Sequence, residues 1–299
     1  MGTPDFAVQS LKTLVENNYQ VIAVVTAPDK PSGRGLQLHP SPVKKYAVEN
    51  HIPVFQPMKL KSPEFIESLK SLQADLQIVV AFRMLPEIIW SMPRLGTINL
   101  HASLLPDYRG AAPINWAIIN GEKETGITTF FLKHEIDTGD VLLTEKIPIG
   151  ENENAGQLHD KLMEKGAELI LKSVELIAAG NYSTTPQTRT SDKSAPKIFK
   201  ENCIIDWNND VEQIRNFVRG LSPYPTAYTL LENKILKVFE VKVEQSEQSL
   251  LPGSILTDNK SYLKFAAKNG YVSVIELQLE GKKRMPVQEF LKGYQVRTT

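Results

Sequence analysis

Two polar side chains, an amide and an imidazole, lie close together at the end of an apolar stretch of the sequence. Residues 97–101 read Thr-Ile-Asn-Leu-His, and the side chains of a β-strand alternate between its two faces. Asn99 and His101 therefore share one face, while Ile98 and Leu100 point into the opposite layer. In an open α/β sheet, the strand ends are where ligands and chemistry are usually found. The structural alternative is an asparagine that caps a turn and a core histidine satisfied by a backbone carbonyl.

A carboxylate follows at Asp137, within the Glu-Ile-Asp-Thr-Gly-Asp sequence of residues 135–140. This segment lies between two expected strands, so a loop there can present a side chain over the edge of the sheet. Taken alone, an aspartate before Thr-Gly is typical of a turn. Its combination with Asn99 and His101 makes the three side chains a candidate site.

The elements that must position these residues are visible in the first 180 residues. Strand and helix patterns alternate there, which predicts a mainly parallel sheet with helices on both faces. Strands are expected at residues 21–26, 76–81, 97–101, 125–132 and 141–149. A hydroxyl residue followed by proline is typical of the start of a helix, and such pairs occur at Thr3-Pro4, Ser41-Pro42 and Ser62-Pro63. A long helix over about residues 157–179 closes the unit before Gly180-Asn181.

A second unit is expected after a segment rich in Ser, Thr and Pro, residues 181–196. We therefore predict an N-terminal α/β domain of Rossmann type at 1–180, a linker at 181–200 and a C-terminal domain at 201–299. One helix is expected at about 210–219, followed by short strands at 227–231, 235–243, 253–256, 263–267 and 272–279. Short strands separated by turns predict a small β-barrel of the oligonucleotide-binding (OB) type.

The N-terminal residues look like the turn and helix that follow a first strand, but no strand precedes them in this sequence. Either the start codon has been placed inside the gene or the strand has been lost. In a doubly wound sheet that strand would be central, and its removal leaves ladder groups unpaired. We therefore expect a hole, or a compensating rearrangement, at the centre of the sheet.

Composition bounds the class of protein. The 299 residues carry no net charge and are 41% hydrophobic, ample for a core in each of two domains. We expect a cytoplasmic protein with no membrane partner, since no run is long and apolar enough to span a bilayer and no signal peptide is apparent. The single cysteine, Cys203, excludes an internal disulfide. We expect no metal, because the five histidines show no ligand spacing.

The motifs together resemble the folate-dependent formyltransferases over essentially the whole chain. The resemblance rests on Asn99, His101 and Asp137 with the loop at 103–106. It extends to Gly-Thr-Pro-Asp-Phe-Ala at 2–7, Pro-Asp-Lys-Pro-Ser-Gly-Arg-Gly at 28–35 and Arg-Gly-Ala-Ala-Pro at 109–113. In the second domain it includes Arg-Gly-Leu-Ser-Pro-Tyr-Pro at 219–225. The absent first strand is the one clear departure, and it puts stability in doubt more than identity.

The resemblance implies a reaction and roles for three catalytic residues. N10-formyltetrahydrofolate would be the co-substrate, with the amino group of methionine on initiator methionyl-tRNA as acceptor, so that the product serves translation initiation. The reaction passes through a tetrahedral intermediate that needs hydrogen-bond donors and a proton acceptor. Asn99 and His101 would donate to its oxygen. Asp137 would favour the charged imidazole and relay the proton of the amine.

The resemblance also assigns binding residues. The folate pocket would be formed by Phe82, Arg83, Met84, Leu85, Pro86, Ser103, Leu104, Leu105 and Pro106, with Asp140 at its border. Contacts to tRNA phosphates would come from Lys30, Arg34, Lys44, Lys45, Lys282, Lys283 and Arg284. We expect the protein to act as a monomer.

Three rival functions remain open at this point. One is a formyltransferase acting on the amine of a sugar nucleotide, which shares the Asn, His and Asp set. Another is a formyltetrahydrofolate hydrolase, which gives the formyl group to water and needs neither a basic loop nor a barrel. The third is a non-catalytic RNA-binding protein that uses the barrel, although a scaffold gains nothing from three convergent polar groups.

Overall fold

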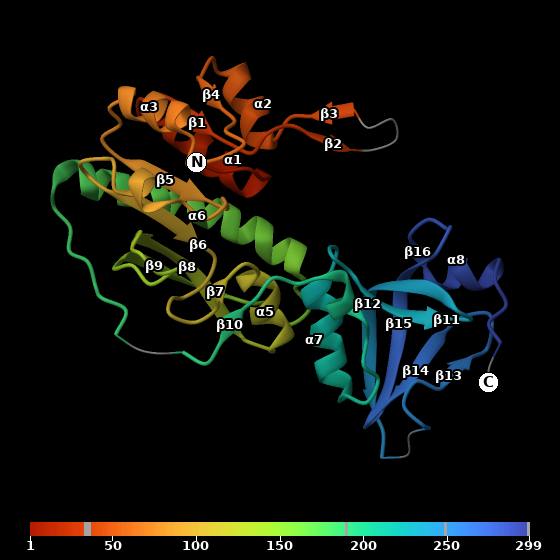
Figure 1. Cartoon of the computed structure of the whole chain (residues 1–299). Helices are drawn as coiled ribbons and strands as arrows, with labels where there is room; N and C mark the ends of the chain where they lie inside the picture. The colour runs from red at the N-terminus through yellow and green to blue at the C-terminus, as the bar shows by residue number, and fades with distance from the viewer. Residues whose placement is uncertain (33–36, 189–190, 248–249, 298–299) are drawn as a thin grey trace. The chain divides into compact units, whose positions relative to one another are not determined.

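The computed structural model describes residues 1–32, 37–188, 191–247 and 250–297, and the chain forms two compact units (Figure 1). Unit 1 comprises residues 1–110, 125–147 and 159–194. Unit 2 comprises residues 111–124, 148–158 and 195–299. Among the described residues, no helix has the length and apolar character needed to cross a membrane. Arg34 lies outside the described residues.

Unit 1 contains the α/β sheet that sequence analysis predicts. Four strands lie side by side in the order β5 (Gln77–Val80), β6 (Thr97–His101), β8 (Glu124–Phe131) and β9 (Val141–Pro148) (Figure 1). β5 and β6 are parallel, with Val80 beside Leu100, whereas β8 runs antiparallel to β6. A separate parallel pair is formed by β1 (Val24–Val25) and β4 (Val54–Phe55).

Helices and short strands complete unit 1. The helices are α1 (Asp5–Glu16), α2 (Pro42–Glu49), α3 (Pro63–Ser71), α4 (Glu87–Trp90) and most of α6 (Ala155–Ala179). A hairpin of β2 (Lys30–Ser32) and β3 (Gln37–His39) and the short strands β7 (Arg109–Gly110) and β10 (Ser194–Ala195) were not predicted as elements. Apolar side chains of β1, β5, α3 and α4 form one core, which includes Val25, Phe65, Val79 and Ile89.

The predicted helix starts are confirmed in two of three places. The Ser41 hydroxyl accepts a hydrogen bond from the Lys44 amide at 3.1 Å, and the Ser62 hydroxyl accepts one from the Phe65 amide at 3.3 Å. The prediction for Thr3 was wrong. Helix α1 begins one residue later, with Pro4 itself in the extended cap position and no side-chain cap bond.

Unit 2 is built on an antiparallel sheet in the order β11 (Ala227–Leu231), β12 (Lys234–Gln245), β15 (Gly270–Leu279), β14 (Leu263–Ala267) and β13 (Ile255–Thr257). A further strand, β16 (Met285–Pro286), pairs with β15. The sheet is strongly curled, as expected for an OB-like barrel (Figure 1). It packs with α7 (Val211–Leu221) and α8 (Val287–Lys292) around a core that includes Val218, Phe265 and Phe290. Helix α5 (Pro113–Ile119) and the 3-10 turn η1 (Lys200–Cys203) also belong to this unit.

The centre of the α/β sheet is interrupted where the sequence predicts a hole. β1 pairs with β4 and β5 pairs with β6, and these two groups of strands form separate sheets. A strand was expected over residues 21–26, but only Val24–Val25 adopts one. Within the described ranges, no strand pairs with residues 20–23.

Candidate active site

His101 ends β6 as its last residue, and its ring is held on both sides. The His101 Nε2 atom lies 2.9 Å from the carbonyl oxygen of Tyr108. Its Nδ1 atom faces the Asp137 carboxylate, with Oδ2 at 3.9 Å. The two side chains are only 8% and 12% exposed. Since Nε2 is directed at a carbonyl, Nδ1 is the nitrogen that faces the site.

Asp137 lies in the loop between β8 and β9, and its backbone has a φ of +55°. Its Oδ2 atom accepts a hydrogen bond from the Gly110 amide at 3.1 Å. The separation of 3.9 Å between this atom and His101 Nδ1 is too long for a hydrogen bond. The carboxylate therefore lies beside the imidazole with no hydrogen bond between them.

Asn99 lies two residues before His101 on the same face of β6. Its backbone is fixed on both sides, by Val79 of β5 and Phe130 of β8, and its side chain is partly exposed. The structure thus places Asn99 on the face of β6 that carries His101 and brings His101 within 3.9 Å of Asp137, all within unit 1.

Gln187, which was not among the predicted site residues, holds the Asp137 loop. The Gln187 Nε2 atom donates hydrogen bonds to the carbonyl oxygens of Asp137 at 3.0 Å and Gly139 at 2.7 Å. Its Oε1 atom accepts one from Arg109 Nη2 at 2.6 Å. Gln187 lies in a segment read as a surface linker, and no local pattern distinguishes it from its polar neighbours.

The loop at 103–106 is fixed by a threonine of β8. The Thr128 hydroxyl donates to the Ser103 carbonyl at 2.7 Å and accepts from the Leu105 amide at 3.2 Å. The Ser103 hydroxyl donates to the Asp107 carbonyl at 2.6 Å. Leu104 packs so closely on Gly126 that a Cβ there would lie 2.4 Å from its Cδ2 atom. The loop is thus rigidly held beside the end of β6.

The segment at 82–86 follows β5 directly, and β5 is the parallel neighbour of β6. Its residues have distinct surroundings. Phe82 and Leu85 pack in the core of unit 1, whereas Met84 is 74% exposed. Arg83 donates to the carbonyls of Pro57 and Met58, and Pro86 precedes α4. Few side chains of this segment are therefore free to contact a ligand, and its backbone groups are the main candidates for ligand binding.

Asp140 accepts a hydrogen bond from Lys133 at 2.7 Å in the loop after Asp137. Among the residues the structure describes, no group of three or more His, Cys, Asp or Glu side chains could hold a metal ion. Cys203 is buried, and this burial raises the pKa of its thiol.

The basic residues expected to contact tRNA fall in both units. Lys30 and Lys45 are exposed in unit 1, but Lys44 is bound to Asp29 at 2.5 Å. Hydrogen bonds from Lys44 and Gln56 lower the pKa of Asp29. In unit 2, Lys282 and Lys283 are exposed, and Arg284 pairs with Glu276 while its guanidinium covers the Phe239 ring at 4.1 Å.

Comparison with known proteins identifies both parts of the chain. Residues 1–174 match the formyl transferase family model, and residues 197–295 match its C-terminal domain. A methionyl-tRNA formyltransferase of Bacteroides fragilis is 54% identical, over 98% of this chain and 94% of the relative. One of Phocaeicola vulgatus is 57% identical with the same coverage.

Solved structures of lower identity share the fold. WlaRD, a sugar 3N-formyl transferase crystallised with dTDP and 5-N-formyl-THF, has a TM-score of 0.67 at 19% identity. That likeness covers 94% of this chain and 97% of WlaRD. HypX from Aquifex aeolicus, solved with tetrahydrofolic acid, has a TM-score of 0.61 at 23% identity, over 84% of this chain and 45% of HypX. From its family matches and its full-length relatives, this chain belongs to the formyl transferase family.

Proposed function

We propose that this chain transfers the formyl group of N10-formyltetrahydrofolate to the amino group of methionine on initiator methionyl-tRNA. Two relatives named methionyl-tRNA formyltransferase are 54% and 57% identical over nearly the full length of the chain. The observation that carries the chemistry is the meeting of His101, Asp137 and the face of Asn99 at the end of β6.

In the proposed reaction, the methionine nitrogen attacks the formyl carbon and the bond from that carbon to folate N10 breaks. The amine loses a proton and N10 gains one. The carbonyl oxygen carries negative charge in the tetrahedral intermediate, and preorganised donors at such a position typically contribute about 3 kcal/mol each. We assign these donors to the Asn99 amide and to Nδ1–H of the His101 ring.

Asp137 supplies the negative charge that balances an imidazolium at His101. His101 Nδ1 and Asp137 Oδ2 are 3.9 Å apart and share no hydrogen bond. The carboxylate would therefore be able to accept the proton of the amine, directly or through one water. The Gly110 amide and Gln187 hold the Asp137 loop in place for this role.

The folate co-substrate would lie beside this site, between the segment at 82–86 and the loop at 103–106. Both follow strands that are parallel neighbours, so the two segments meet at one edge of the sheet. Backbone groups and apolar walls of this kind suit a flat pteridine ring. The reaction would take place in the cytoplasm, and the protein would act as a monomer, since unit 1 alone supplies the three catalytic side chains.

The tRNA would be held through its phosphates by the exposed lysines Lys30, Lys45, Lys282 and Lys283, with Arg34, Lys44 and Arg284 as further candidates. Phosphate contacts give an affinity that depends strongly on salt and little on base sequence. Lys44 and Arg284 already have acidic partners, so their contribution would require those pairs to open or to be shared.

A formyl-transfer assay with N10-formyltetrahydrofolate and three acceptors tests this function. The acceptors are initiator methionyl-tRNA, a dTDP-amino sugar and water. Transfer to the tRNA alone is the expected result. Transfer to the amino sugar or to water, with none to tRNA, would overturn the assignment and favour the sugar-nucleotide or hydrolase alternative.

A further inference from the structure

Arg109 belongs to the motif at 109–113, and the proposed catalytic roles leave its side chain unexplained. Its Nη2 atom donates to Oε1 of Gln187 at 2.6 Å, a short distance typical of a hydrogen bond whose donor is charged. Its Nε atom is buried and has no hydrogen-bond partner in the part of the chain that the structure describes. The guanidinium is thus placed where it meets Gln187, and not where its Nε is paired.

The bond from Arg109 fixes the direction in which the amide of Gln187 points. With Oε1 turned to the guanidinium, Nε2 faces the carbonyl oxygens of Asp137 and Gly139, at 3.0 Å and 2.7 Å. If the amide were reversed, its NH2 group would face a guanidinium that only donates, and its oxygen would face two carbonyl oxygens. All three hydrogen bonds would then be lost. Arg109 therefore selects the one orientation in which Gln187 can hold the loop.

A short backbone pairing brings Gln187 to this loop. Thr185 and Val141 form an antiparallel bridge, with amide-to-carbonyl hydrogen bonds of 2.9 Å and 2.8 Å in the two directions. Val141 is the first residue of β9, directly after the loop that carries Asp137. The segment at 185–187 therefore lies alongside the loop, within reach of its carbonyl groups.

Asp137 is consequently held at two points by residues that are neighbours in sequence. The Gly110 amide donates to its carboxylate, while Arg109 acts through Gln187 on its carbonyl oxygen. These contacts fix both the side chain and the backbone of Asp137 relative to one short strand, β7. Support is needed because the φ of Asp137 is +55°, a conformation that residues other than glycine adopt infrequently.

We propose that Arg109 is a positioning residue for formyl transfer, which acts through Gln187 to hold the Asp137 carboxylate beside His101. The proposal rests on the proposed function, because that function gives Asp137 its part in the reaction. Without Arg109, the amide of Gln187 is free to turn and the loop is free to leave its left-handed conformation. A displacement of about 1 Å in a reacting group can slow a reaction by about 100-fold, so the loss should be seen in kcat.

The test compares Arg109→Met, Gln187→Leu and the double variant by their kcat and KM values with N10-formyltetrahydrofolate and initiator methionyl-tRNA. We expect Arg109→Met to lower kcat by roughly 10-fold, with both KM values nearly unchanged. The double variant should match Gln187→Leu within about threefold, because the two side chains act in series. Losses that multiply in the double variant would show that Arg109 acts independently. A raised KM at unchanged kcat would show that it binds substrate, and either result would overturn the proposal.

A second substitution separates the two kinds of hydrogen bond that Gln187 makes. Gln187→Glu keeps an oxygen that can accept from Arg109 but removes both donors to the loop. We expect its kcat to fall as far as that of Gln187→Leu. Normal turnover by Gln187→Glu would overturn the proposal, since the loop would not need the hydrogen bonds that Arg109 directs.

Hydrogen exchange of the Gly110 amide gives a readout that does not depend on the reaction, because this amide donates to Asp137. Its protection factor should fall by at least about 10-fold in Arg109→Met and in Gln187→Leu, with each variant shown by thermal melting to be folded. Arg94→Met is the control, since Arg94 forms an exposed ion pair elsewhere in unit 1 and should leave kcat and protection unchanged. Unchanged protection of Gly110 in Arg109→Met would overturn the proposal. Absence of formyl transfer by the unmodified protein would instead refute the proposed function, and the exchange rates would still decide whether Arg109 holds the loop.

Discussion

The charge of Asp137 should matter for the reaction more than its hydrogen bond. Asp137→Asn keeps an oxygen that can accept from the Gly110 amide but removes the negative charge 3.9 Å from His101 Nδ1. At that distance, with an effective dielectric constant of about 20, the interaction of two unit charges is roughly 4 kcal/mol. Both side chains are nearly buried, so screening by solvent is small.

If the charged imidazole stabilises the intermediate, this loss slows formyl transfer by a factor of about 10³. The assay is single-turnover transfer to methionyl-tRNA at saturating N10-formyltetrahydrofolate, with folate binding measured separately by titration. We expect binding to be nearly unchanged. Glu135→Gln is the matched control, since that carboxylate is exposed in the same loop. A rate for Asp137→Asn within tenfold of the unmodified protein would refute the electrostatic role.

Three other predictions concern separate parts of the molecule. Gln187→Leu removes the two hydrogen bonds from this side chain to the Asp137 loop, so kcat should fall by roughly 10-fold to 100-fold with little change in the KM for folate; a change in KM alone would contradict this. Between pH 8 and pH 5 the Met1 amine is neutral when folded but protonated when unfolded, since its folded pKa is about 5 and its ordinary value 8.0. The unfolded state then binds more protons, so the free energy of unfolding should fall by up to roughly 4 kcal/mol as the pH drops through this range; urea titrations should show this, and Nα-acetylation should remove it. Replacing Lys282 and Lys283 together by alanine should reduce the salt dependence of tRNA binding by about two units of log slope and leave folate affinity unchanged, and an unchanged slope would remove both from the interface.

Much of the fold could be predicted because its signals are local. The alternation of apolar residues places β6 at residues 97–101, the same bounds that the structure shows. Ser41 and Ser62 act through hydroxyls three residues before the amides they accept from, which a reader of the sequence can see directly. Thr3 shows the limit of that reasoning. The same pattern, a hydroxyl residue followed by proline, does not cap α1, because the N-cap position is occupied by Pro4, which has no hydroxyl.

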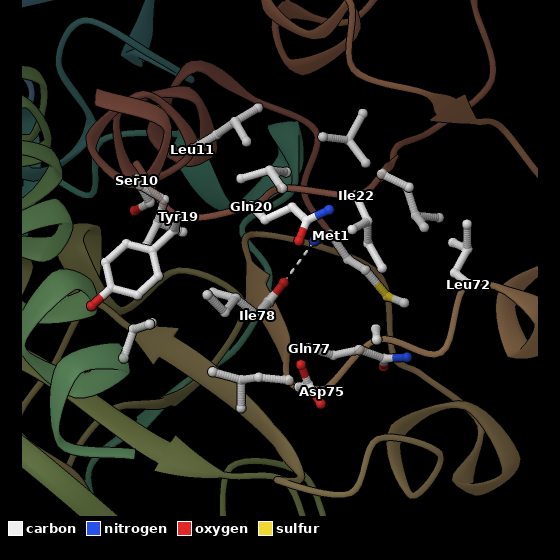
Figure 2. A pocket seen from close by; sticks show the side chains of 18 of the residues that line it. Met1, Ser10, Leu11, Tyr19, Gln20, Ile22, Leu72, Asp75, Gln77 and Ile78 are labelled. Carbon is white, nitrogen blue, oxygen red and sulfur yellow. Dashed lines mark hydrogen bonds between the residues drawn. The ribbon is translucent and has the colours of Figure 1, made fainter. Parts of the chain in front are cut away.

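The strand at residues 21–26 was predicted too long for a related reason. Its apolar pattern is that of a buried strand, but a strand needs a neighbour, and residues 20–23 line a cavity within unit 1 instead (Figure 2). Propensity is therefore overridden by the absence of a pairing partner.

In the candidate site, side-chain periodicity and motif resemblance find Asn99, His101 and Asp137, but not the residue that holds the loop. Gln187 follows Asp137 by fifty positions and acts through backbone carbonyls. Contacts of this kind leave no periodic signal in one sequence. The partners of Lys44 and Arg284 were likewise invisible, since each is set by the folded packing of distant segments.

The role of this strand end in the reaction can be measured as the rate of formyl transfer to initiator methionyl-tRNA by His101→Ala in a single turnover, with N10-formyltetrahydrofolate saturating. We expect a rate at least about 100-fold below that of the unmodified protein, with folate still bound, because the imidazole at the end of β6 no longer donates to the intermediate. A near-normal rate with folate bound would contradict the claim that this strand end is where the reaction occurs.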